Sequence, residues 1–182
     1  SLVRTRAILE DDKRTPHRAS DKLTLRANFV IFFVIRHGAN RGPAFLAGTA
    51  SEFIRRNRKN PFVLFVNFLE PHSPYWSVRD EQYAPNEIDL PPDLDLPPGE
   101  QHPLKTRLFA RAHSATHKTE AEWRSLISRY WGLCSLVDTH VGTILRALED
   151  TGLLDSTIIV YTSDHGDMMG SHRLVGKGVQ FE

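Results

Sequence analysis

The order of the elements that the sequence predicts is typical of an α/β fold with a mainly parallel sheet flanked by helices. Three apolar runs, 28–35, 61–68 and 157–162, have the length and the β-branched and aromatic content of buried strands. Two stretches with helical periodicity, 44–59 and 119–150, alternate with these runs. Because a strand, a helix and another strand in succession favour a crossover connection, we expect the strands to pair in parallel.

The first predicted helix, 44–59, places Leu46, Phe53 and Ile54 near one face. Four Arg and Lys residues occupy its last turns, where cations suit the negative end of the helix dipole. Asn60 and Pro61 then end the helix, because the residue before a proline disfavours helical backbone.

The second predicted helix, 119–150, repeats apolar residues at three- and four-residue steps from Trp123 to Leu148. Thr119 and Glu122 have the spacing of a capping box at its start. Gly152 is the residue expected to end it.

Composition narrows the classes of function. The chain has 182 residues, a net charge of +1 and ordinary globular fractions of apolar (40%) and charged (25%) residues, so a nucleic acid or a membrane surface is not expected as its main partner. No apolar run is long enough to span a bilayer, and the N-terminal residues lack the apolar core of a signal peptide. The single cysteine excludes an intrachain disulfide.

The chain divides into two parts at about residue 42. Residues 1–42 are highly charged at first and give no assignment beyond the apolar run at their end. Residues 43–182 are expected to form one α/β unit that contains a long loop, 69–118, rich in Pro, Asp and His. Both chain ends suggest a segment of a longer protein, so we expect the sheet to be incomplete.

Reactive side chains follow two of the predicted strands. His72 comes after the run 61–68, and Asp164 and His165 come directly after the run 157–162. Because the carboxyl ends of parallel strands meet at one edge of a sheet, we expect these side chains to lie close together.

Asp164 and His165 have the residue types of a metal site. A carboxylate and an imidazole at a turn can reach one cation, and Gly166 permits the bend. Two ligands do not complete a site, and Asp164 as a turn cap with His165 on the surface is an alternative interpretation.

His72 and Lys177 have the residue types of an anion site. Pro71 and Pro74 restrain the backbone around His72, whose imidazole can bind an anion or protonate a leaving group. Lys177 lies between two glycines, which allow an ammonium to approach a sulfate or a phosphate closely. A packing histidine and a solvated lysine remain the alternatives.

Residues 161–178, YTSDHGDMMGSHRLVGKG, together with 61–75, PFVLFVNFLEPHSPY, and the helix and strand over 130–166, resemble the sulfatases of the alkaline phosphatase superfamily. The resemblance extends over roughly residues 43–182. It implies an alkaline-phosphatase-like fold and the hydrolysis of a sulfuric ester.

The resemblance also implies roles for four residues. Asp164 and His165 match ligands of a divalent cation, usually calcium. His72 matches a histidine that contacts the sulfate ester and helps the leaving group depart, and Lys177 matches a lysine that binds the sulfate oxygens. The formylglycine nucleophile of the family arises in a C/S-x-P-x-R motif that this sequence lacks, so we expect it in a missing N-terminal part and expect this chain alone to be inactive.

Two alternatives stay open. A phosphodiesterase or phosphonate monoester hydrolase of the same superfamily would use Mn²⁺ or Zn²⁺, and a non-catalytic remnant would only bind a cation or an anion. For a sulfatase, the resemblance implies a small-molecule or carbohydrate sulfate ester as substrate and is compatible with a periplasmic or extracellular location. The oligomeric state is left open.

Overall fold

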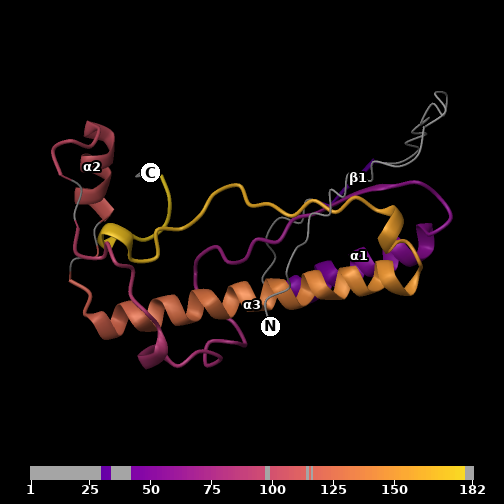
Figure 1. Ribbon diagram of the computed structural model, residues 1–182, viewed down its shortest axis with the longest axis horizontal. Helices are drawn as coiled ribbons and strands as arrows, with labels where there is room; N and C mark the ends of the chain where they lie inside the picture. The colour runs from indigo at the N-terminus through magenta and orange to yellow at the C-terminus, as the bar shows by residue number, and fades with distance from the viewer. Residues whose placement is uncertain (1–29, 34–41, 97–98, 114, 116, 179–182) are drawn as a thin grey trace, which may run out of the picture.

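The computed structural model describes residues 42–96, 99–113, 115 and 117–178, and the backbone of residues 30–33. Two long helices lie side by side, and extended chain runs along them (Figure 1). The elements in chain order are β1 (Val30–Phe33), α1 (Pro43–Asn57), β2 (Val63–Val66), the 3₁₀ turn η1 (Pro85–Glu87), α2 (Leu104–His113), α3 (Glu120–Asp150), η2 (Leu154–Ser156) and η3 (Ser171–Arg173).

The strands β1 and β2 pair in parallel. Their register runs from Val30 opposite Val63 to Phe33 opposite Val66. These two strands therefore pair in parallel as expected, whereas a mainly parallel sheet of more strands is not confirmed among the described residues, and β2 is shorter than its apolar run. Residues 28, 29, 34 and 35 of the first run lie outside the described residues.

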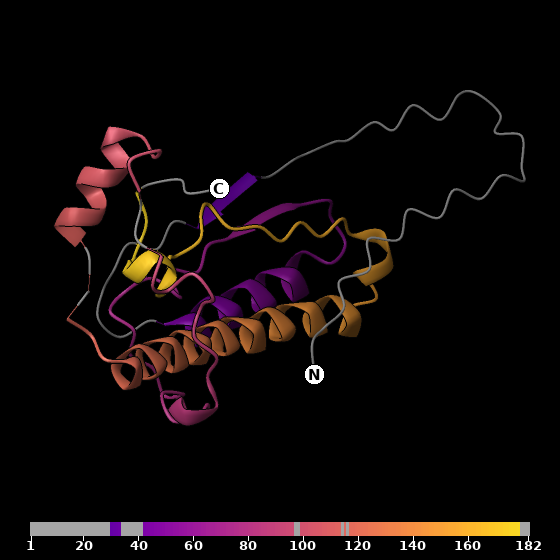
Figure 2. The same ribbon diagram turned by 60° about the vertical axis from the view of Figure 1, so that its left-hand side comes forward.

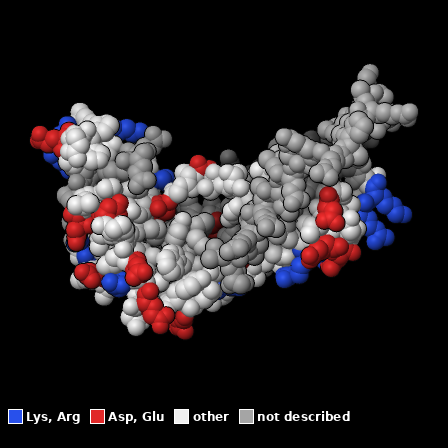
Figure 3. Space-filling view, in the orientation of Figure 1, with Lys and Arg blue, Asp and Glu red and all other residues white. Residues whose placement is uncertain are grey.

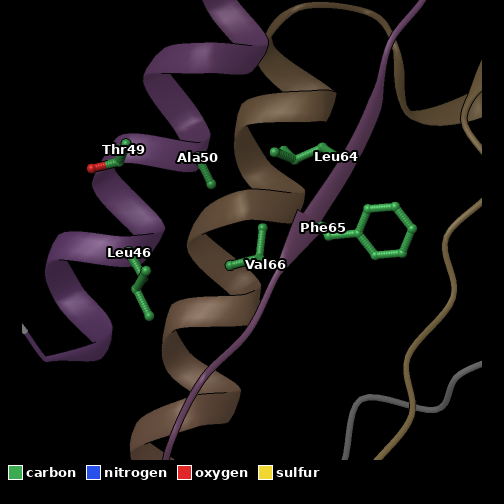
Figure 4. A pocket seen from close by; sticks show the side chains of 6 residues that line it. All are labelled: Leu46, Thr49, Ala50, Leu64, Phe65 and Val66. Atoms are coloured by element: carbon green, nitrogen blue, oxygen red, sulfur yellow. The ribbon is translucent and has the colours of Figure 1, made fainter. Parts of the chain in front are cut away.

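The helix α1 packs against α3 and β2, as its apolar face predicts. Ile54, Ala147 and Leu148 form a buried cluster against which Phe62 and Leu64 pack. Leu64 and Val66 point to the helix side of β2 and Phe65 to the other side, around a small apolar pocket at α1 (Figure 4). The alternation of side chains along β2 thus fastens the strand to the helix layer.

The ends of α3 form as the sequence predicts. The Thr119 hydroxyl accepts a hydrogen bond from the backbone N–H of Glu122, whose carboxylate accepts one from the backbone N–H of Thr119, so the capping box is confirmed. At the other end Gly152 has a φ of 69° and its N–H donates to the Glu149 carbonyl at 2.9 Å. The N–H of Leu153 donates to the Leu148 carbonyl at 2.9 Å, which completes a Schellman motif.

The prediction of a third strand at residues 157–162 is wrong. The segment is extended but joins no strand in the part of the chain that the structure describes. Ile158 is 93% exposed and Val160 is 81% exposed. An apolar run becomes a strand only where a neighbouring strand accepts its backbone hydrogen bonds, and within the described ranges the sheet has two strands, not three.

The long segment 69–118 carries more structure than the mostly irregular loop that we expect. It contains η1 and α2, and the buried side chains of Ile88 and Leu94 anchor it on α3. Two side chains of α3 bind its backbone: Arg124 donates to the Ile88 carbonyl, and the Ser128 hydroxyl donates to the Tyr83 carbonyl at 2.6 Å. Tertiary contacts with α3 thus organise this segment.

The cations at the end of α1 lie at one end of the molecule, close to carboxylates (Figure 3). Arg55 pairs with Asp150 at 3.8 Å, and Arg56 pairs with Glu52. Among the residues described here, no helix is both long enough and apolar enough to cross a lipid bilayer.

Candidate functional site

The four predicted site residues lie in two segments that are far apart in the sequence. His72 lies in the turn after β2, and Asp164, His165 and Lys177 lie in the segment after η2. All four are exposed. The second segment runs back along α3, from the end of that helix toward its start (Figures 1 and 2).

Asp164 and His165 bring two electron-pair donors together. The Nδ1 atom of His165 lies 2.8 Å from the Gly166 carbonyl oxygen, which only accepts, so Nδ1 carries the proton. The Nε2 atom lies 3.4 Å from Oδ2 of Asp164. Oδ1 of Asp164 accepts the backbone N–H of His165 at 2.9 Å, which fixes the carboxylate. Oδ2 and Nε2 therefore face each other as two electron-pair donors. Either a proton on the imidazole or a cation bound by both atoms offsets the repulsion between them.

His72 repeats this arrangement in the other segment. Its Nδ1 lies 2.7 Å from the Ser73 carbonyl oxygen, so that nitrogen is again the donor and Nε2 is left for a ligand. The backbone N–H of His72 donates to the Leu69 carbonyl at 3.1 Å, which closes the turn. The imidazole is thus held by its own turn and remains exposed to solvent.

The position of Lys177 is set by the backbone conformation of the two glycines that flank it. The flanking residues Gly176 and Gly178 have φ values of 84° and 128°, a region that favours glycine. A Cβ atom at Gly178 would lie 2.9 Å from the Phe109 ring of α2, so this glycine also permits a close approach to that helix. Lys177 forms no ion pair with the other described residues, which leaves its ammonium available for an anion.

A carboxylate that the sequence analysis left without a role joins the two segments. The hydroxyl of Tyr75 donates to Oδ2 of Asp167 at 2.7 Å. Oδ1 of Asp167 accepts the backbone N–H groups of Met169 at 3.1 Å and of Gly176 at 2.9 Å. Tyr75 lies three residues after His72, and Gly176 directly precedes Lys177. Both segments therefore meet at Asp167.

Two tyrosines surround this junction and remain protonated at neutral pH. Burial raises the pKa of Tyr75, and its hydrogen bond to the Asp167 carboxylate raises it further. Burial, with a smaller effect from the neighbouring Cys134, raises the pKa of Tyr130 to about 12. The two rings pack edge to face with centroids 5.9 Å apart. Tyr75 is thus a reliable hydrogen-bond donor to Asp167.

The structure brings together fewer metal ligands than a complete site needs. Within the described ranges, no three His, Cys, Asp or Glu side chains form a group that could hold a metal ion. The donor types of Asp164 and His165 fit a divalent cation, but Ca²⁺ takes six to eight ligands. The sequence analysis missed the bond between Tyr75 and Asp167, although Asp167 belongs to the same polar motif as the predicted ligands.

Comparison with known proteins gives one consistent result. The sequence profile of the family described as "Sulfatase" matches residues 39–181. Arylsulfatase K of Danio rerio is 30% identical over 140 residues, which cover 67% of this chain and 26% of that protein. An arylsulfatase of Clostridium perfringens is 31% identical over 130 residues, covering 70% and 27%. The multifunctional alkaline phosphatase superfamily protein PehA of Trinickia caryophylli is 29% identical over 147 residues, covering 73% and 29%.

A solved structure agrees with these sequences. The crystal structure of the presumed sulfatase yidJ from Bacteroides fragilis superposes with a TM-score of 0.55 at 30% identity and covers 74% of this chain and 27% of that one. The chain spans about a quarter of the length of the curated relatives that it matches.

Proposed function

Because the chain belongs to the sulfatase family, we propose that it contributes the second half of a cation site and an anion-binding lysine to an enzyme that hydrolyses sulfate esters. The matched residues, 39–181, include all four candidate site residues. Since the chain spans about a quarter of its relatives, the activity is proposed for a complete protein and not for these 182 residues alone.

The proposed cation ligands are Asp164 and His165. Oδ2 and Nε2 are the atoms left free by the backbone contacts of the two side chains, and they lie 3.4 Å apart. We propose Ca²⁺ as the cation, because a carboxylate at an exposed turn suits a hard ion with a flexible coordination shell. When bound, such an ion would offset the negative charge that develops on the oxygens of a sulfuryl group during transfer.

The proposed anion ligands are Lys177 and His72. The Lys177 ammonium is a compact charge suited to a sulfate oxygen. His72 would hold a proton at Nε2 and give it to the ester oxygen as the bond from sulfur to that oxygen breaks, so that the alcohol leaves neutral. Its Nδ1–H stays bound to the Ser73 carbonyl, which keeps the ring oriented through the transfer. The attacking nucleophile, a formylglycine in this proposal, would come from outside this sequence.

The observation that carries the proposal is the 3.4 Å distance between Oδ2 of Asp164 and Nε2 of His165. Metal binding by these two atoms can be tested directly. Isothermal calorimetry of this chain with CaCl₂ is expected to show weak binding, since only part of a ligand set is present. Asp164→Ala should weaken that binding by about tenfold or more. Asp155→Ala is a matched control, because Asp155 is another exposed carboxylate at a turn after α3 and lies outside the site. Tight binding that survives Asp164→Ala would overturn the assignment.

Activity requires a second experiment on the gene with its flanking sequence. An aryl sulfate is the first substrate to test, because two of the relatives are named arylsulfatases. Lys177→Ala should abolish hydrolysis, whereas Lys59→Ala, two residues after the end of α1, should not change it. The organic part of the natural ester is proposed to be a small molecule or a carbohydrate, handled in the periplasm or outside the cell.

A phosphodiesterase is the second candidate, because the relative PehA is described as a multifunctional member of the alkaline phosphatase superfamily. Faster hydrolysis of a phosphodiester than of an aryl sulfate, with Mn²⁺ or Zn²⁺ preferred over Ca²⁺, would favour it. Cation binding with no hydrolysis of either substrate would instead identify a non-catalytic member.

A further inference from the structure

Asp167 makes more hydrogen bonds through its side chain than its proposed neighbours in the site do. Its carboxylate accepts from the Tyr75 hydroxyl at 2.7 Å, from the Gly176 N–H at 2.9 Å and from the Met169 N–H at 3.1 Å. None of these bonds has a part in the proposed binding of cation or anion. They need a separate explanation, because Tyr75 is buried and comes from a segment 92 residues away.

One oxygen of this carboxylate closes a loop. Oδ1 binds N–H groups at both ends of the stretch 168–176, and the Met168 N–H donates to the Gly176 carbonyl at 2.9 Å beside it. The loop therefore starts just after His165 and ends just before Lys177. Without the carboxylate, two inward-facing N–H groups would lose their partner, and the path of the chain to Lys177 would be less restricted.

The other oxygen reaches across to the turn that contains His72. Tyr75 is fixed by its packing with Ile127, Leu133 and Met169 in a buried cluster, so its hydroxyl is a rigid point of attachment. The raised pKa of this tyrosine is consistent with a permanent donor. Each of the four candidate site residues thus lies within three residues of Asp167 itself or of a group that binds its carboxylate.

We propose that Asp167 is a positioning residue, which through Tyr75 fixes the His72 turn relative to the loop that presents Asp164, His165 and Lys177. What the four residues bind rests on the proposed function, whereas the coupling of the two segments does not. A carboxylate is well suited to this task, because it accepts from three donors and donates to none.

The test separates coupling from local capping by measuring each side of the junction. Amide hydrogen exchange is followed at Met169 and Gly176 on one side and at His72 and Trp76 on the other, since all four N–H groups have acceptors in the structure. Asp167→Ala should raise exchange about tenfold or more on both sides, because charged hydrogen bonds are lost. Amides in the second half of α3 serve as the reference and should not change.

Tyr75→Phe is the decisive variant, because it removes one hydroxyl and leaves the bonds of Asp167 to the loop in place. We expect faster exchange at His72 and Trp76, unchanged protection at Met169, and an affinity for sodium sulfate several-fold weaker than that of the parent chain. Asp167→Asn should retain part of the protection, since its amide oxygen still accepts and its NH₂ can donate to the Tyr75 oxygen. Tyr83→Phe is the control, because it removes a hydroxyl that is bound to Ser135 of α3 at 2.6 Å, outside the junction.

The outcomes are distinguishable. Exchange that rises only at Met169 and Gly176 in Asp167→Ala, with no effect of Tyr75→Phe on either side, would overturn the proposal and leave Asp167 as a local cap. If the parent chain binds neither sulfate nor Ca²⁺, the proposed function fails, and the exchange data still decide whether the two segments are coupled.

Discussion

The two halves of α3 are buried by different kinds of structure. The second half packs against a regular partner, α1, through a small apolar cluster that includes Ile54, Ala147 and Leu148. The first half packs against irregular chain: it contacts the segment around Ile88 and Leu94 and the loop that contains Met169. One helix therefore supports a helix at one end and the candidate site at the other.

Polar contacts mark the difference between the two halves. In the first half, Arg124 and Ser128 bind backbone carbonyls of the covering segment, and the Tyr75 hydroxyl binds Asp167 nearby. A regular helix satisfies its own backbone, whereas irregular chain needs partners for its carbonyl and N–H groups. The comparison teaches that irregular segments near a site are fixed by specific hydrogen bonds as well as by apolar burial.

Truncating Trp123, in the first half of α3, should have the largest effect on stability, because this side chain is fully buried under the irregular segments. It packs with Leu94 and Ala115 and lies close to Gly170. Trp123→Ala should lower the free energy of unfolding by about 3–5 kcal/mol, measured by urea titration with circular dichroism. Trp131→Ala is the control, because Trp131 is 42% exposed, and the loss of stability on its truncation should be clearly smaller. Equal losses would contradict the burial that the structure assigns to the first half.

The second-largest effect on stability is expected at Gly132, where the first half of α3 closely approaches the backbone of another segment. A Cβ atom at Gly132 would lie 2.5 Å from the carbonyl oxygen of Arg79, so Gly132→Ala should cost about 1–3 kcal/mol through overpacking. Gly142 lies on the same helix with nothing within 4 Å of such a Cβ. Gly142→Ala should therefore stabilise by up to about 1 kcal/mol. Thermal unfolding measures the change in stability of both variants. A change of the same sign in both would contradict the predicted difference between the two halves.

Alkaline pH should give the smallest effect and should act on the first half. The pKa of Tyr130 is about 12 in the folded chain and about 10 when unfolded. Between these values the unfolded chain holds fewer protons, so stability falls as the pH rises from about 10 to 12. Because the ring is only partly buried, we expect a loss of about 1 kcal/mol.

Urea midpoints at pH 9 and pH 11 measure this slope, and Tyr130→Phe should flatten it. Tyr75→Phe should flatten it further, because burial also raises the pKa of Tyr75. Hydrogen exchange should show the first half of α3 losing protection before the second half. Uniform loss along the helix would argue against a local origin.

The sequence predicts the helices well, because their signals are local. The apolar steps of α3, its capping box at Thr119 and its end at Gly152 lie within the element itself. The strand 157–162 was predicted wrongly, because an apolar run does not report whether a neighbouring strand is present. The helix α2 was missed in a segment whose Pro and Asp content indicated a loop.

The candidate site was predictable in part. His72, Asp164, His165 and Lys177 stand out by residue type and position, and their roles remain predictions. The bond from Tyr75 to Asp167 was beyond reach, because no local pattern encodes a contact between residues 92 positions apart. Asp167, which accepts this bond, nevertheless belongs to the same polar motif as Asp164 and His165.

The exposed run from Ile158 to Tyr161 has a practical consequence for anyone who handles this chain. Four successive large side chains are between 50 and 93% exposed. Such a run has high β-propensity, no charge and no proline, which is the composition of segments that template cross-β stacking. We expect the concentration at which this polypeptide precipitates to depend on these four residues, and a single lysine in place of Val160 to raise it.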